Sequence, residues 1–204
     1  MTPSITVSSI TASEDFYLAA GTVTIDTSTS KVLLIRDRTT GRYKLPRGRK
    51  DWGETLETTA QRETYEETGV RCKLLPVQLR TRATPPRDHP QAAAALFDGT
   101  GDVVSGVSLR EPIAVMQHFQ TNGALAIVFF YVATADSSAP QAEGTQMTDE
   151  DYEAKWVGFK EVARLLTDPR YAEVVAKGIE LAGSPGESDM KPSMEKLVTN
   201  GKIL

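Results

Sequence analysis

Three glutamates crowd the end of one short segment, RETYEETGV (62–70). Glu63, Glu66 and Glu67 are one, three and four residues apart, and Gly69 follows them. At these spacings the side chains project from one face of a helix. Like charges there destabilise a helix by roughly 0.2–0.5 kcal/mol per pair, so we expect a cation to offset the repulsion. Converging carboxylate oxygens suit Mg²⁺ or Mn²⁺, whereas the simpler alternative is a solvated acidic surface.

A run of basic residues precedes the glutamates. Seven cations fall between residues 36 and 50: Arg36, Arg38, Arg42, Lys44, Arg47, Arg49 and Lys50. The guanidinium group of arginine can donate two hydrogen bonds to one phosphate group. A basic loop beside a metal site would therefore hold a highly phosphorylated ligand. The alternative is an ordinary basic surface loop.

The elements that position these residues follow from periodicity. Apolar segments separated by polar turns predict strands over 16–26, 31–37 and 43–46, followed by a basic loop over 47–53. Residues 55–68 change to helix formers, with Leu56, Ala60 and Thr64 along one face. Gly69 is typical of the residue that ends a helix.

The second half of the chain predicts further strands and a terminal helix. Residues 70–83 are strand-like with an edge or bulge at Pro76, and 84–112 form an irregular insertion with a short helix over 91–97. Asn122-Gly123 predicts a hairpin between 113–120 and 124–135, and the second strand is apolar enough to be buried on both faces. A strand over 152–159 and a helix over 159–183, interrupted at Pro169, complete the pattern.

Composition excludes several classes of protein. The net charge of −4 gives no reason to expect nucleic-acid binding, and the longest apolar run is too short to span a membrane. Cys72 is the single cysteine and the N-terminus lacks the pattern of a signal peptide, so we expect a cytoplasmic protein, with the nucleus as a second compartment. We expect a flexible arm over 1–14, one domain over 15–183 and a tail over 184–204. The oligomeric state stays open.

Extended upstream, the acidic segment becomes GRKDWGETLETTAQRETYEETGV (48–70), which resembles the Nudix box. The positions that match are Gly48, Glu54, Arg62, Glu63, Glu66, Glu67, Gly69 and Val70. Thr64 departs from the pattern, since it stands where the box has an apolar residue. Its methyl group can pack, but its hydroxyl needs a partner such as the carbonyl four residues earlier.

The resemblance implies a Nudix fold of the α/β (α+β) class, a mixed sheet sandwiched between helices. It also implies Mg²⁺- or Mn²⁺-dependent hydrolysis of a diphosphate linkage in a small phosphorylated substrate. Glu63, Glu66, Glu67 and the backbone carbonyl of Gly48 would bind the metal. The same three glutamates are the catalytic candidates, with Glu66 or Glu67 as the base, and Glu54 with Arg62 would form a structural pair.

Residues 57–69 more specifically resemble the branch that hydrolyses diphosphoinositol polyphosphates and diadenosine polyphosphates. That branch has a more glycine-rich loop where this chain has Arg49 and Lys50. The phosphate-binding candidates are Arg36, Arg38, Lys44, Arg47, Arg49 and Lys50. Two alternatives stay open: an ADP-ribose or other nucleoside-diphosphate hydrolase, indicated by Pro85-Pro86, and a non-catalytic Nudix module that binds a ligand.

Five other residues have weaker claims. Trp52 either stacks on a base or packs the loop against the helix start. Glu150 and Glu153 are candidates for a further carboxylate near the metal, against a solvated acidic turn. His118 fits a half-buried structural histidine. His89 fits an exposed surface residue better than a residue that contacts phosphate.

Overall fold

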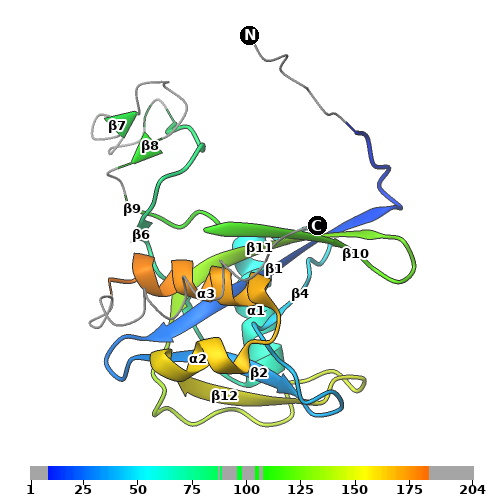
Figure 1. The fold of residues 1–204 in the computed structure, drawn as a ribbon. Coiled ribbons are helices and arrows are strands. Elements are labelled where there is room, and N and C mark those ends of the chain that lie inside the picture. Colours follow the sequence, from blue (N-terminus) through cyan, green and yellow to red (C-terminus); the bar gives the residue numbers. More distant parts are fainter. Residues whose placement is uncertain (1–8, 87, 89–95, 98–103, 106–107, 184–204) are drawn as a thin grey trace.

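The computed structural model describes residues 9–86, 88, 96–97, 104–105 and 108–183. Within them, a mixed sheet with the strand order β10-β11-β1-β2-β12 lies between helices (Figure 1). Its main strands are β1 (Phe16–Asp26), β2 (Lys31–Asp37), β10 (Ala114–Phe119), β11 (Leu125–Thr134) and β12 (Tyr152–Gly158). Three shorter strands pair with its inner strands: β3 (Tyr43–Lys44) with β2, β4 (Arg47–Arg49) with β1, and β5 (Lys73–Leu74) with β11. The helices are α1 (Leu56–Thr68), α2 (Phe159–Leu165) and α3 (Pro169–Leu181).

Strand β1 lies at the centre of the sheet. It runs parallel to β11 from the pair Phe16–Leu125 to the pair Ile25–Thr134, and antiparallel to β2 and β4. Successive side chains of a strand point to opposite faces. Val23 therefore faces α3, where it contacts Gly178, while Thr22 faces α1, where it hydrogen-bonds Thr64.

The two faces of the sheet bury different side chains. The face under α3 holds the main apolar core, which includes Val23, Ile25, Val128, Phe130 and Val175. The face under α1 holds a small apolar cluster of Ala20, Ala60 and Tyr131. The fully buried Thr22, Thr24 and Thr64 lie on this face as well. The helices cover opposite faces, as Figure 1 shows.

Helix α1 begins and ends as the sequence predicts. The Thr55 side chain accepts a hydrogen bond from the backbone N–H of Thr58, and Gly69 adopts a left-handed conformation with φ 69°. A Cβ at Gly69 would also lie 2.1 Å from the carbonyl oxygen of Ala142. Glycine is thus required both by the backbone angle and by the loop packed against the end of the helix.

Several predicted elements differ from the observed ones. The segment 70–83 is not one strand, because Pro76 separates β5 from β6 (Val77–Gln78), which pairs with β9 (Ser108–Leu109) in a separate small sheet. The predicted helix over 91–97 is wrong at Leu96–Phe97, which is strand β7 paired with β8 (Val104–Ser105), and its other residues lie outside the described ones.

Two differences concern strands of the main sheet. The predicted loop 47–53 begins as strand β4, which pairs with β1. Strand β11 is buried on both faces only over its second half, since Leu125, Ile127 and Phe129 are half-exposed. Among the described residues, no helix combines the length and apolar character needed to span a membrane.

Candidate active site

An ion pair fixes the loop before α1 to the helix itself. Arg62 donates from Nε to Glu54 Oε1 at 2.7 Å and from Nη2 to Glu54 Oε2 at 3.0 Å. The hydrogen bonds from Arg62 lower the pKa of Glu54 to about 2. Thr59 and the backbone N–H of Asp51 also donate to Glu54, and Arg62 donates to the carbonyl of Arg49 at 2.8 Å. The structure thus brings Glu54 and Arg62 together as a bidentate pair that holds the basic loop in place.

Glu63 is buried against the loop at Gly48. Glu63 is only 8% exposed, and this burial raises the pKa of its carboxyl group to about 7. A Cβ added to Gly48 would lie 2.1 Å from Glu63 Oε2, so only glycine permits this approach. The backbone of β4 and the carboxylate of α1 therefore lie in contact.

Glu67 is the most buried of the three glutamates, at 3% exposure. Its Oε2 accepts a hydrogen bond of 2.8 Å from the backbone N–H of Arg47. Burial raises the pKa of Glu67, although the charge of Lys44 and the bond from Arg47 act in the opposite direction. The positive charge near Glu67 is therefore not enough to offset the cost of burying its carboxylate.

Glu66 is the most accessible of the three glutamates. One nitrogen of Arg62, Nη1, donates to Glu66 Oε2 at 2.7 Å and to Glu63 Oε1 at 2.8 Å. The side chain of Glu66 is 33% exposed. The backbone carbonyl of Glu66 accepts a bond from Thr145, which ties the 139–146 loop to the end of α1.

The donor set fits a hard divalent cation. Glu63 and Glu67 are buried carboxylates with raised pKa values, and their oxygens suit Mg²⁺ or Mn²⁺. In the described ranges, no group of three or more His, Cys, Asp or Glu side chains converges as a metal ion requires. Arg62 Nη1 lies between Glu63 and Glu66 and donates to both. An ion held here would share these two carboxylates with Arg62.

The exceptional residue of the box, Thr64, has the predicted partner. Its hydroxyl donates to the carbonyl of Ala60 at 2.7 Å. It also contacts the hydroxyl of Thr22 at 2.7 Å, and Thr22 contacts Thr24 at 2.6 Å. A short chain of buried hydroxyls thus joins α1 to β1 beside the apolar cluster of Ala20, Ala60 and Tyr131.

The basic residues divide into two groups. Arg36 and Arg38 are paired with Glu153 and Asp151, at 3.7 and 3.3 Å. These pairs lie along β12 and the turn before it. The structure does not bring either arginine into contact with the box glutamates.

The other four predicted cations lie around Gly48. Lys44 donates to the Tyr152 hydroxyl at 3.1 Å, and Arg49 stacks over Tyr17 with 4.1 Å to the ring centroid. Lys50 donates to the carbonyl of Asp51. The Nε of Arg47 is buried and has no hydrogen-bond partner among the described residues.

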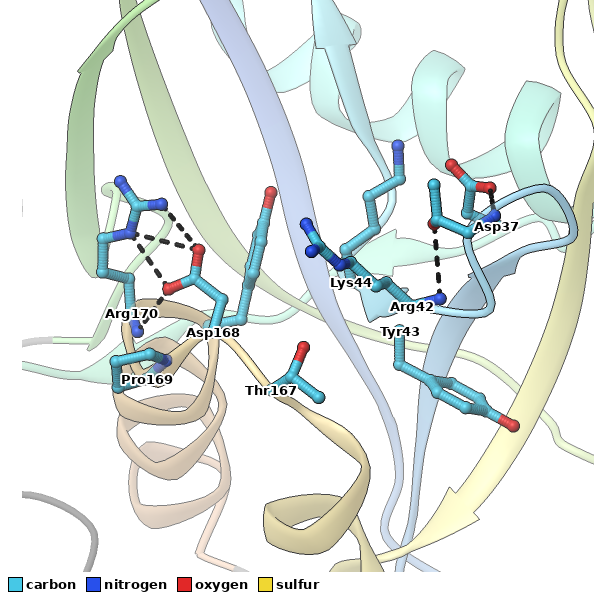
Figure 2. Close-up of a pocket in the computed structure, with 10 residues that line it drawn as sticks. Asp37, Arg42, Tyr43, Lys44, Thr167, Asp168, Pro169 and Arg170 are labelled. Carbon is cyan, nitrogen blue, oxygen red and sulfur yellow. Dashed lines mark hydrogen bonds and ion pairs between the residues drawn. The ribbon is translucent and has the colours of Figure 1, made fainter.

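A cavity of about 870 Å³ lies beside this group, between the β2–β3 turn and the α2–α3 turn (Figure 2). Arg42 and Lys44 contribute to one wall, and Thr167, Asp168 and Arg170 to the other. No residue of the second wall is among the sites predicted from the sequence. The Asp-Pro pair at 168–169 signals only the start of a helix, and no local pattern places that helix start opposite the hairpin.

The weaker candidates have clear positions. Trp52 is fully exposed, so the prediction that it packs the loop against the helix is wrong. Glu150 accepts a bond from the Met147 N–H, and Glu153 is paired with Arg36 and Lys155. His118 is half-buried and contacts Gln120, while His89 lies outside the described residues.

Comparison with known proteins agrees with this architecture. A family model described as NUDIX domain matches residues 15–178. Solved structures with the same fold include a NUDIX-family hydrolase from Clostridium perfringens, at 17% identity, TM-score 0.53, 81% coverage of this chain and 97% of that one. Another is a C. elegans Ap4A hydrolase, at 17% identity, TM-score 0.52, 82% coverage of this chain and 98% of that one. With the box residues gathered between α1 and β4 and the matched domain spanning most of the sequence, the chain belongs to the NUDIX family and is a pyrophosphohydrolase.

Proposed function

We propose that this protein hydrolyses a diphosphate linkage in a highly phosphorylated substrate, with Mg²⁺ or Mn²⁺ as cofactor. The substrate class is a diphosphoinositol polyphosphate or a dinucleoside polyphosphate. The observation that carries the proposal is the contact between the buried Glu63 and Gly48, which sets the acidic end of α1 directly against the basic loop.

The proposed metal ligands are Glu63, Glu66, Glu67 and the carbonyl oxygen of Gly48. When bound there, the ion neutralises phosphate charge and acidifies the attacking water. The protein's own residues hold this group in place: Arg62 orients Glu63 and Glu66, and the N–H of Arg47 orients Glu67. Glu66 or Glu67 accepts the proton of the attacking water.

Lys44, Arg47, Arg49 and Lys50 are the proposed phosphate contacts nearest to this group. Phosphoryl transfer depends mainly on positioning and charge stabilisation, so cations held by neighbouring aromatic rings and carbonyls favour it. Arg49 over Tyr17 and Lys44 over Tyr152 are held in this way. Arg36 and Arg38 are the proposed contacts for phosphates farther from the scissile bond. These phosphates would compete with Glu153 for Arg36 and with Asp151 for Arg38.

A turnover panel tests the proposal. The full-length protein with Mg²⁺ is given an inositol pyrophosphate, a diadenosine polyphosphate and ADP-ribose at equal concentrations, and released phosphate or nucleotide is measured with and without a chelator. We expect metal-dependent hydrolysis of one or both of the first two, at a higher kcat/KM than for ADP-ribose. Faster hydrolysis of ADP-ribose would replace the proposed substrate class by the nucleoside-diphosphate alternative.

A further inference from the structure

The cavity between the two turns is large enough to hold a substantial part of a substrate. Its volume of about 870 Å³ lies within the usual range for small-molecule sites. Figure 2 shows Arg42 reaching from the hairpin toward the α2–α3 turn, with Thr167 on the opposite side. Lys44 connects this cavity to the box, because it lines the cavity and its charge acts on Glu67.

The acidic side chains of the cavity are already bound. Asp37 accepts the N–H of Thr40 at 2.7 Å. Asp168 caps α3 through the N–H of Arg170 and also pairs with the guanidinium of Arg170 at 2.6 Å. Asp37 and Asp168 are therefore each bound to donors of their own turn.

Arg42 is different from these groups. It is exposed, and within the described part of the chain no hydrogen bond or ion pair of its guanidinium is found. Lys44, on the same wall, directs its ammonium to Tyr152. Arg42 is therefore a cation on the cavity wall that is available to a ligand, and Lys44 adds a second positive charge to the same wall.

The two tyrosines that line this cavity, Tyr43 and Tyr171, are poorly placed to stack on a nucleobase. Tyr171 is only 7% exposed, and its ring makes an edge-to-face contact with Phe130, with centroids 6.2 Å apart. The Tyr43 ring points away from the centre of the cavity in Figure 2. Stacking on an aromatic side chain contributes to the binding of a base, so a lining without such a surface favours a charged ligand over a base.

We propose that this cavity binds the part of the substrate remote from the scissile diphosphate, and that Arg42 makes it selective for a phosphate-bearing polyol ring rather than a nucleoside. This inference rests on the proposed function, and it chooses between the two substrate types named there. Arg42 is a specificity-determining residue in this account, and it takes no part in the chemical step.

Binding to the metal-free, full-length protein tests the inference without turnover. Calorimetric titrations compare inositol hexakisphosphate, which has no diphosphate linkage, with ADP. We expect inositol hexakisphosphate to bind more tightly, and Arg42→Gln to weaken its binding about tenfold, as for the loss of one charged hydrogen-bonding group. Arg42→Lys should retain most of the affinity.

Lys73→Gln is the matched control, because it removes one exposed cation on β5, which pairs with β11 and contributes nothing to the cavity wall. An equal loss of affinity in Lys73→Gln and Arg42→Gln would show a general charge effect and overturn the inference. Tighter binding of ADP than of inositol hexakisphosphate would overturn it as well. A failure of this kind leaves metal-dependent hydrolysis intact, whereas failure of the proposed function would appear as absence of turnover in the panel.

Discussion

Helices α1 and α3 are both thirteen residues long and cover opposite faces of one sheet, yet they bury opposite kinds of side chain. The buried residues of α3 are Tyr171, Ala172, Val174, Val175, Gly178 and Ile179. Those of α1 are Thr59, Ala60, Glu63, Thr64, Glu67 and Thr68. Only Ala60 in the second set is apolar.

The difference separates packing from chemistry. Burying apolar area stabilises a fold by roughly 25 cal/mol per Å², and α3 uses its whole inner face in this way. Burying a carboxylate without a full counter-charge opposes folding. Glu63 and Glu67 therefore indicate a face that is maintained for function at some expense of stability.

Substitution of a box glutamate should give the largest effect. Glu67→Gln keeps an oxygen acceptor for the Arg47 N–H but removes the charge. We expect kcat to fall about 10²- to 10⁴-fold for Glu67→Gln and for Glu66→Gln. The melting temperature of Glu67→Gln should be equal to or above that of the parent, since burial already disfavours the ionised form. Steady-state kinetics and thermal unfolding measure the two effects.

Glu57→Gln provides the control for these variants, because Glu57 lies exposed in the first turn of the same helix. Its kcat should equal that of the parent. Normal turnover by both Glu66→Gln and Glu67→Gln would contradict the assignment of the metal ligands.

A substitution on α3 should show the reverse pattern. Ile179 is 5% exposed within the main core, and Ile179→Ala should lower the free energy of unfolding by about 2–5 kcal/mol. The kcat of the folded fraction should stay within about twofold of the parent value, because α3 packs here and does not touch the glutamates. Urea unfolding and kinetics at low temperature test this. A large loss of kcat with unchanged stability would remove the distinction between the two helices.

The sequence predicted the α1 side better than the parts that surround it. Strands β1 and β2 have the predicted bounds, and helix α1 begins one residue after its predicted start, since each is specified by local periodicity and by terminal signals such as Gly69. The box residues also gather in one place, because their spacing fixes which residues share a face of the helix. The contact between Glu63 and Gly48 depends on β4 pairing with β1, which no local pattern specifies.

Long-range arrangement explains the differences. The segment Leu125–Phe129 was predicted to be buried on both faces, but Leu125, Ile127 and Phe129 are half-exposed where β11 pairs with β10. The second wall of the cavity, at Thr167–Arg170, depends on how the α2–α3 turn lies against a hairpin more than a hundred residues earlier. Tertiary packing of this kind overrides local propensity.

A buried carboxylate outside the site offers a third comparison. Asp26, at the end of β1, is 5% exposed and accepts bonds from Ser28, Thr29 and Ser137. Burial raises its pKa, but these hydrogen bonds together hold the pKa well below the ordinary value. Glu67, with a single backbone donor, has its pKa raised instead.

Asp26→Asn should therefore destabilise the fold, by about 1–3 kcal/mol at pH 7. Because the folded-state pKa is lowered, the contribution of Asp26 is fully present above the unfolded value of about 3.9 and is lost as pH falls below it. Unfolding free energies at pH 7 and near pH 3 should show the difference between parent and variant shrinking toward acid. A difference that grows toward acid would contradict the described hydrogen bonding.

The smallest effect is expected at Thr64, where the box departs from its usual apolar residue. Thr64→Val removes a hydroxyl bonded to the Ala60 carbonyl and to Thr22, but Thr22 keeps its bond to Thr24. Since no buried hydroxyl is left alone, the free energy of unfolding should change by less than about 1 kcal/mol. Thr22→Val removes the middle of the same chain of hydroxyls and should cost more, about 1–3 kcal/mol. Paired urea titrations decide the order: if Thr64→Val proved the more damaging, the hydroxyls would matter to α1 itself, and the polar face of this helix would have a packing role beside its chemical one.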